Sequence, residues 1–416
     1  MEPKMKKCGA SHIYKNILLC CTALALLSGC ADQPSEPTEI GEVTYKVISE
    51  GDSGAALDPD RYSKPVETEF IDVPDEMILS YGYEQLDKSG RVIYNLISDA
   101  MKNCQPTVEI PNVDRTGKLY NRVLELIRCE NLGYFHVKSR SIGSRTIASK
   151  SFNIDFEYRY TAEEANTMLR KAETAADDII MKITPDMTEY DKLKLFHDEI
   201  ITGCKSSTDG EYADNIYGAL VDGQALCEGY AKAFSYLCGR VGIENTIVTG
   251  YADEAHMWNM VKLDGNWYHV DLTWDHPDAA LSAAYPDAVL YNYFLVSDAD
   301  ITDDRTIDDS LFTPPRATGS VMNYFYHEGM YADSYEAALN AIESGCRNAA
   351  ENGRHSFQIK LASDELYAQV LSDISVKSSN GRDTDITAAM KAAGFSGRIS
   401  YTDLYSGRRI LTFLLN

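Results

Sequence analysis

The chain has 416 residues, and its 63 Asp and Glu outnumber its 39 Lys and Arg, which gives a formal net charge of −24. A charge this negative argues against nucleic acid as a partner and against electrostatic binding to anionic lipid. The length suits two or three globular domains.

Residues 1–30 are typical of a targeting segment. Four lysines precede an apolar run at 17–27, which is too short for a comfortable membrane span and ends in Leu27-Ser-Gly-Cys30. This ending resembles the bacterial lipobox, in which the cysteine is lipidated after cleavage. We therefore expect a lipoprotein signal peptide at 1–30 and an extracytoplasmic protein anchored to the bacterial cell membrane by lipid on Cys30. An uncleaved anchor or a plain secretory signal is the alternative.

A flexible tether is expected at 31–60, which is rich in Pro, Ser, Glu, Asp and Gly. Residues 61–160 then mix helical and strand patterns and predict a small N-terminal α/β domain. The apolar periodicity predicts helices at 87–101 and 119–128, and strands at 106–113, 134–137 and 151–160.

Two helices should follow. Thr161 with Glu164 three residues later is an N-cap pattern, and the helix that it opens is expected to run to about residue 183. A second helix is predicted to begin near Thr188 and to end before Gly203. His197 lies on this second helix and is expected to be structural.

Cys227 is the first candidate catalytic residue. It opens a helical pattern, because Tyr230, Phe234 and Leu237 recur at helical spacing and indicate one buried face. The positive end of the helix dipole and the free backbone N–H groups at this position favour a thiolate and could hold an oxyanion. Gly223 suits a tight entry turn, and Gly229 allows close backbone packing.

A hairpin should bring a histidine and an aspartate together. Strands are predicted at 256–263 and 266–274, and Asp264-Gly265 between them is a two-residue turn signal. The register pairs Leu263 with Asn266 and would place His256 diagonally opposite Asp271 on one face. A three-residue loop would put the two on opposite faces. Cys227, His256 and Asp271 would then be the nucleophile, its base and the group that orients the base.

Other residues offer alternatives. A metal site from His256, His269, Asp275 and His276 is conceivable, but the sequence lacks HExxH and CxxC spacings, so we expect no metal and no cofactor. Six cysteines follow the tether, and at least one besides Cys227 must then be unpaired, so folding should not depend on disulfides.

Residues 316–416 are expected to form a C-terminal α/β module. Its predicted helices lie at 335–344, 364–374 and 386–393, its first strand at 356–361, and a terminal hairpin at 398–405 and 408–415. The sequence does not decide whether this module binds substrate or packs against the core.

The motifs around the triad resemble the transglutaminase-like superfamily of papain-type thiol enzymes. They are Phe196-His197-Asp198, Tyr217-Gly-Ala-Leu220, the run into Cys227, His256-Met-Trp-Asn, and Tyr293-Phe-Leu-Val-Ser-Asp298. The resemblance implies an α+β fold in which the helix carrying Cys227 packs on an antiparallel sheet at 161–315, flanked by the two smaller α/β modules. Met257 stands where the family often has alanine, which leaves the strand alternation intact.

The resemblance implies a thiol enzyme that acts on a peptide or carboxamide through an acyl-enzyme. The Cys227 N–H and a side chain, Gln224 or Tyr217, would hold the oxyanion. Trp258 and Trp274 could line the acyl channel, although large aromatics on a hairpin more often belong to the core. The partner would be a protein or peptide substrate, and cell-wall peptides would be within reach of an anchored enzyme. The rival functions are a non-catalytic binding or scaffold lipoprotein, a metal-dependent hydrolase and a solute-binding lipoprotein.

Overall fold

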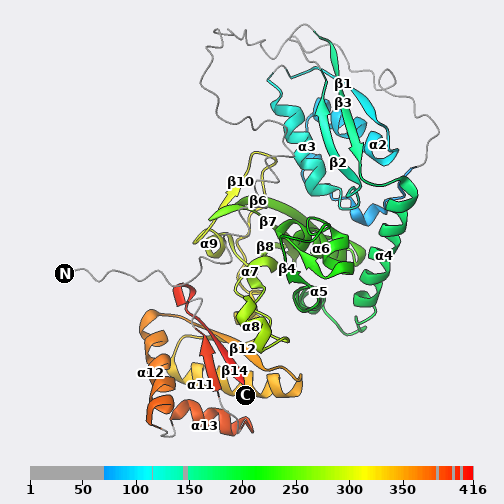
Figure 1. Cartoon of the computed structure of the whole chain (residues 1–416). Helices are drawn as coiled ribbons and strands as arrows, with labels where there is room; N and C mark the ends of the chain where they lie inside the picture. Colours follow the sequence, from blue (N-terminus) through cyan, green and yellow to red (C-terminus); the bar gives the residue numbers. More distant parts are fainter. Residues whose placement is uncertain are drawn as a thin grey trace, which may run out of the picture.

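The structure is a computed structural model that describes residues 70–114, 116–143, 149–380, 384–395, 399–402 and 406–415. The expected signal peptide, Cys30 and the tether lie outside the described residues. Three units follow one another down Figure 1, and the unit that carries Cys227 lies in the middle. Among the helices of the described residues, none is long and apolar enough to cross a bilayer.

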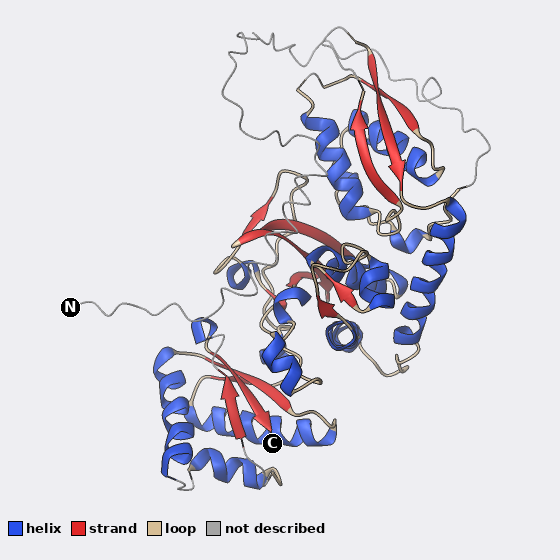
Figure 2. Cartoon of the chain, viewed as in Figure 1, coloured by secondary structure: helices blue, strands red, loops and turns tan. Residues whose placement is uncertain are grey.

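The first unit is a three-stranded antiparallel sheet with two helices beside it (Figure 2). Strand β3 alternates as predicted, because Phe152, Ile154 and Phe156 are buried and the residues between them are exposed. The sheet order is β1-β3-β2. The elements are α2 (Lys88–Lys102), β1 (Thr107–Pro111), α3 (Lys118–Glu130), β2 (Val137–Ile142) and β3 (Ser151–Tyr158).

The strand predicted at 134–137 was misplaced, since β2 begins only at Val137. Residues before it form a turn in which the His136 ring stacks on Tyr158, with ring centroids 5.3 Å apart. Strand β2 lies at the sheet edge, and its side chains are partly or fully exposed. An edge strand of this kind lacks the alternation of apolar and polar residues from which strands are predicted.

The central unit packs a helix against an antiparallel sheet, as predicted. Thr161 and Thr188 both form capping boxes, so the two expected helices begin where the sequence placed them. Helix α6 packs on β6 and β7 of a sheet ordered β10-β6-β7-β8-β9. The elements are α4 (Ala162–Ile180), α5 (Glu189–Gly203), α6 (Cys227–Arg240), β6 (Asn245–Ala252), β7 (Glu254–Leu263), β8 (Asn266–Val270), α7 (Leu272–Asp275), β9 (Phe294–Val296), α9 (Asp298–Ile301) and β10 (Thr306–Asp308).

The last unit is a mixed sheet with three helices. Strand β13 pairs antiparallel with β14, which confirms the terminal hairpin, and the order β11-β12-β14-β13 includes a parallel pair at β11 and β12. The elements are β11 (Tyr331–Ala332), α11 (Tyr335–Glu351), β12 (Ser356–Leu361), α12 (Asp364–Asn380), α13 (Asp385–Ala392), β13 (Ile399–Thr402) and β14 (Ile410–Leu415).

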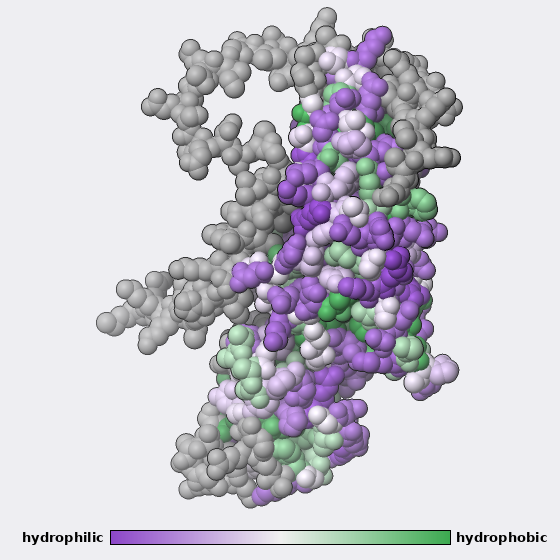
Figure 3. Space-filling view, turned by 45° about the vertical axis from the view of Figure 1, so that its right-hand side comes forward, coloured by the Kyte–Doolittle hydropathy of each residue, from purple (hydrophilic) through white to green (hydrophobic). Residues whose placement is uncertain are grey.

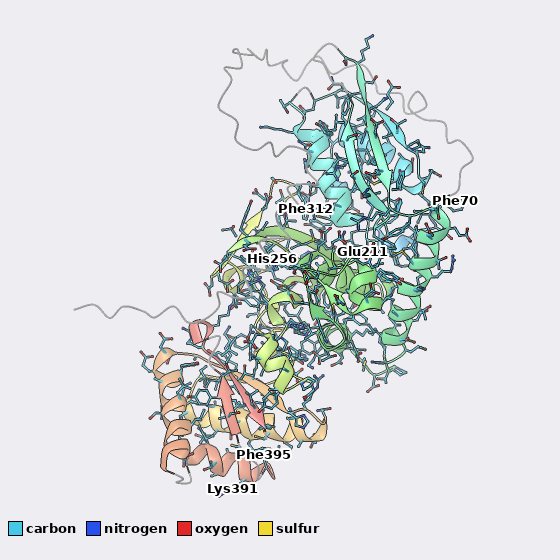
Figure 4. All side chains as sticks on the ribbon, in the orientation of Figure 1. Phe70, Glu211, His256, Phe312, Lys391 and Phe395 are labelled. Carbon is cyan, nitrogen blue, oxygen red and sulfur yellow. The ribbon has the colours of Figure 1, made fainter. Side chains whose placement is uncertain are left out.

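Both outer units contact the central unit. In the first unit, Arg128 on α3 forms an ion pair of 2.6 Å with Glu228, the residue after Cys227 on α6. Phe312 lies between the first and central units (Figure 4) and is buried. In the last unit, the Gln358 side chain accepts a hydrogen bond of 2.8 Å from the Tyr291 backbone. The nucleophile helix is therefore held from the side of the first unit as well as by its own sheet.

Candidate active site

Cys227 is the first residue of α6, and Leu226 is the N-cap. Leucine cannot cap a helix with its side chain, and no side-chain hydrogen bond caps this one. The first hydrogen bond within the helix runs from the Tyr230 N–H to the Leu226 carbonyl, at 3.0 Å. The N–H groups of the first turn therefore have no acceptor inside the helix, and they concentrate positive potential at the half-buried Cys227 thiol.

Two glycines shape the entry to this helix, as the sequence predicts. Gly223 has φ +64°, a left-handed conformation that side chains other than glycine rarely adopt. A Cβ on Gly229 would lie 2.3 Å from the Ala213 carbonyl oxygen. That same oxygen accepts the Leu226 N–H at 2.8 Å. The loop at Ala213 is thus pressed against the turn that presents Cys227.

His256 and Asp271 meet directly. The His256 Nε2 atom lies 2.8 Å from Asp271 Oδ2. Asp271 is fully buried, and His256 is 7% exposed. A hydrogen bond between the side chains of His256 and Cys227 contributes to the electrostatics of the imidazole. Because Nε2 is used by Asp271, Nδ1 is the ring nitrogen that remains for the sulfur.

The hairpin register is confirmed, but its second strand is shorter than predicted. Leu263 pairs with Asn266, and the ladder ends at Asn259 with Val270. Asp271 then leaves the sheet and caps the short helix α7, with its Oδ1 accepting the Trp274 N–H at 3.2 Å. An aspartate whose side chain accepts the N–H three residues later favours a helix start over a continued strand. The carboxylate still reaches His256 from this cap position.

The electrostatics of the pair favour a charged imidazole. Burial by itself lowers the pKa of His256, but Asp271 and the hydrogen bond to Cys227 outweigh burial and raise that pKa to about 9. Burial raises the pKa of the Asp271 carboxyl, whereas His256 and Arg305 lower it to about 2. Near neutral pH the pair is therefore an imidazolium and a carboxylate.

This ion pair predicts how stability depends on pH. The folded pKa of His256, about 9, lies above its ordinary value of 6.5. Its charge therefore stabilises the fold fully below pH 6.5, and this contribution is lost as the pH rises through 9. The shift corresponds to about 3 kcal/mol. Urea unfolding between about pH 6 and about pH 9.5 should show this loss, and His256→Gln should show much less of it. Parallel pH profiles for the two proteins would contradict the prediction.

Arg305 is a residue at this site that the sequence analysis missed. It immediately precedes β10, its side chain is fully buried, and Nη1 forms an ion pair with Asp271 Oδ2. The guanidinium lies 4.1 Å from the Tyr293 ring centroid and 4.9 Å from that of Trp274. No local motif marks an arginine far along the chain from its aspartate, so only the fold reveals the contact.

The two tryptophans differ in position. Trp258 is 1% exposed and stacks on His256, with ring centroids 5.7 Å apart, so it supports the imidazole from within the core. It does not line an open channel. Trp274 is half-buried and meets the His256 ring edge-on at 6.5 Å. Of the two, Trp274 is the one in a position to contact a substrate.

The two oxyanion candidates lie upstream of Cys227. Gln224, on β5 (Gln224–Ala225), is exposed and lines a hollow of about 370 Å³ together with Glu211 and Gly218. Glu211 is labelled in Figure 4 beside the loops that precede α6. Tyr217 is buried and packs edge-on against Tyr212, with centroids 5.1 Å apart. Gln224 is therefore the more accessible candidate.

The remaining histidines have partners of their own. His269 accepts the Trp258 indole N–H at 3.0 Å and contacts Asp298 at 3.1 Å. His276 contacts two backbone carbonyls, those of Pro277 and Cys204. His197 is fully buried between Asp198 and Asp275. Across the described part of the chain, no group of three or more His, Cys, Asp or Glu side chains is arranged to hold a metal ion.

A comparison with known protein families finds a match over this same stretch. Residues 175–272 match the family model described as the transglutaminase-like superfamily, and this span includes Cys227, His256 and Asp271. The kyphoscoliosis peptidases of Mus musculus and Homo sapiens are each 27% identical to this chain over 165 residues, which is 35% of this chain and 24% of theirs. The chain thus spans about a quarter of the length of these relatives.

Among solved structures, the crystal structure of a TGase overlaps in part. It is 12% identical, and the overlap covers 40% of this chain and 50% of that chain, with a TM-score of 0.24.

Proposed function

Since the chain belongs to the transglutaminase-like superfamily through its residues 175–272, we propose that it is a thiol enzyme acting on peptide or carboxamide bonds. The observation that carries this proposal is the geometry of the triad. Cys227 sits at an uncapped helix N-terminus with a hydrogen bond to His256, and His256 Nε2 lies 2.8 Å from Asp271.

In the first half-reaction, the Cys227 thiolate attacks the carbonyl carbon, and a tetrahedral oxyanion forms. The His256 imidazolium donates its proton to the leaving amine or ammonia, the C–N bond breaks, and a thioester remains on Cys227. Asp271 keeps Nδ1 of His256 directed at the sulfur and stabilises the imidazolium.

In the second half-reaction, neutral His256 accepts a proton from water or from a primary amine as that nucleophile attacks the thioester. The Cys227 thiolate leaves, which restores the ion pair. Water gives peptidase or amidase activity, and an amine gives transamidation. The relatives are named peptidases, which favours hydrolysis as the first activity to test.

The oxyanion would be held by the backbone N–H of Cys227 and by one side chain. Gln224 is the more accessible of the two candidates because it is exposed beside the hollow that precedes α6. Tyr217 is buried and would need to be uncovered.

The setting of the activity is part of the proposal. A lipid on Cys30 would hold the enzyme outside the cytoplasm, facing the cell wall and other extracytoplasmic proteins. The face in Figure 3 is largely hydrophilic, with smaller groups of apolar residues among the polar ones.

The test is the rate of iodoacetamide alkylation at Cys227 against pH, followed on the Cys227 peptide by mass spectrometry. A working Cys–His pair should reach half-maximal rate at least about one pH unit below the 8.5 typical of a free thiol, and His256→Ala should lose this advantage. A slow reaction that is the same in folded wild type and folded variant would contradict the proposal. It would favour the alternative of a non-catalytic binding or scaffold lipoprotein.

A further inference from the structure

Arg305 shares one carboxylate oxygen with the histidine of the triad. Asp271 Oδ2 accepts from His256 Nε2 at 2.8 Å and from Arg305 Nη1, while Oδ1 accepts the Trp274 N–H. The Arg305 Nε atom is 3.0 Å from Asp304 Oδ1. Its Nη2 is buried without a hydrogen-bond partner.

The guanidinium is confined by its surroundings. It lies over the rings of Tyr293 and Trp274, and Trp258 is 5.7 Å away, so the flat group is held among aromatic faces. Such a site suits arginine and not lysine, because a planar cation can both stack and form a directed ion pair. A buried cation this well fixed keeps its charge throughout the reaction.

A count of charges shows what Arg305 does for the site. When Arg305 is present, the net charge of the site is zero in the reactive form, which has a Cys227 thiolate, a His256 imidazolium, an Asp271 carboxylate and the guanidinium. Burial therefore favours this thiolate form. Without Arg305, the thiolate form carries one net negative charge. The form with zero net charge then has the unreactive Cys227 thiol beside the imidazolium and the carboxylate. Low-dielectric surroundings penalise net charge, so the Arg305 cation decides whether the Cys227 thiolate or the Cys227 thiol is preferred.

We propose that Arg305 is a positioning residue that holds Asp271 ionised and oriented, and thereby lets Cys227 form its thiolate near neutral pH. This inference rests on the proposed function. The charged and titratable groups that face the Asp271–Arg305 pair are His256 on β7, His269 on β8, Asp275 on α7, and Asp304, Tyr293 and Arg408. Of these, only His256 connects the pair to the sulfur.

The experiment measures the pH of half-maximal Cys227 alkylation in the full chain, purified in detergent. Arg305→Met should raise this pH by about one unit. Arg305→Lys keeps the charge but loses the stacking and the directed ion pair, so its value should lie between those of wild type and Arg305→Met. A folded Arg305→Met protein with the wild-type curve would overturn the proposal, provided that His256→Ala shifts the curve. If His256→Ala shifts nothing either, the proposed function itself fails, and the role of Arg305 fails with it.

A second variant covers the case in which Arg305→Met does not fold. Asp304 shares the guanidinium with Asp271, and its side chain is 34% exposed, so Asp304→Asn should be tolerated. Without this competing carboxylate, the positive charge of Arg305 acts more strongly on Asp271. The pH of half-maximal alkylation should then fall by a few tenths of a unit, opposite in sign to the effect of Arg305→Met. A value that stays the same or rises would overturn the proposal.

Discussion

Replacing Cys227 by alanine is expected to slow acyl transfer by at least about 10⁴-fold, because the proposed mechanism carries the acyl group on this sulfur and alanine offers no replacement. The measurement uses a glutamine-containing peptide and follows three products: ammonia, the peptide with a primary amine incorporated, and the cleaved peptide. All three should disappear together, since hydrolysis and transamidation share the same thioester. If the proposed activity is present, the ratio of the products in wild type reports whether water or the amine is the preferred acceptor.

Cys238→Ala is the matched control. Cys238 lies on the same helix α6 and is fully buried, and burial alone raises the pKa of its thiol far above the usual range, so it takes no part in the proposed chemistry. This variant should retain activity and lose only a little stability. Retention of activity in Cys227→Ala would exclude the thioester mechanism. Equal losses in both variants would point to damage to α6 and not to loss of the nucleophile.

The hairpin was the most predictable part of the site. Asp264-Gly265 fixes the turn, the pairing of Leu263 with Asn266 follows from it, and the structure has this register. The alternating Trp, Tyr and Val residues on both sides of the turn had no competing explanation. Local sequence therefore determined which strands pair and which face His256 occupies.

The end of that hairpin was not predictable in the same way. Residues 271–274 alternate like a strand, but Asp271 caps α7 and turns the chain out of the sheet. The alternation of polar and apolar residues does not distinguish an aspartate that caps a helix from one within a strand. Which structure forms depends on the residues that pack around the aspartate. The Arg305 ion pair and the buried position of Trp258 likewise arise from tertiary contacts. The sequence offered no spacing from which to infer either.

The contacts of His197 are a second feature that the sequence did not predict. Its helix was predicted correctly and the histidine was expected to be structural, but no pattern in the sequence indicated which groups it joins. Its Nδ1 atom is 3.3 Å from Asp198 Oδ1, and its Nε2 atom is 3.1 Å from Asp275 Oδ2. Asp275 is the last residue of α7, the helix that Asp271 caps. The histidine therefore ties α5 to the segment that carries the third member of the triad.

Substitution of His197 by alanine is expected to lower the free energy of unfolding by about 3–5 kcal/mol, because it leaves two buried carboxylates without their shared partner. Burial already raises the pKa of Asp275 to about 6, and His197 opposes that rise. Asp198 keeps other partners, since Lys194 lies 2.9 Å and Arg354 3.0 Å from its Oδ2. The loss should therefore be felt mainly at Asp275. Urea unfolding at neutral pH measures it.

Lys194→Ala is the control for this cluster, because Lys194 is 27% exposed and is one of several partners of Asp198. It should lower the unfolding free energy by no more than about 1 kcal/mol. A loss that small in His197→Ala would contradict the role assigned to the buried histidine.

Arg354 comes from the last unit, so the same cluster also joins that unit to the core. If His197→Ala slows Cys227 alkylation while the protein is still folded, the cluster positions Asp271 through α7. If alkylation is unchanged, the cluster serves stability alone.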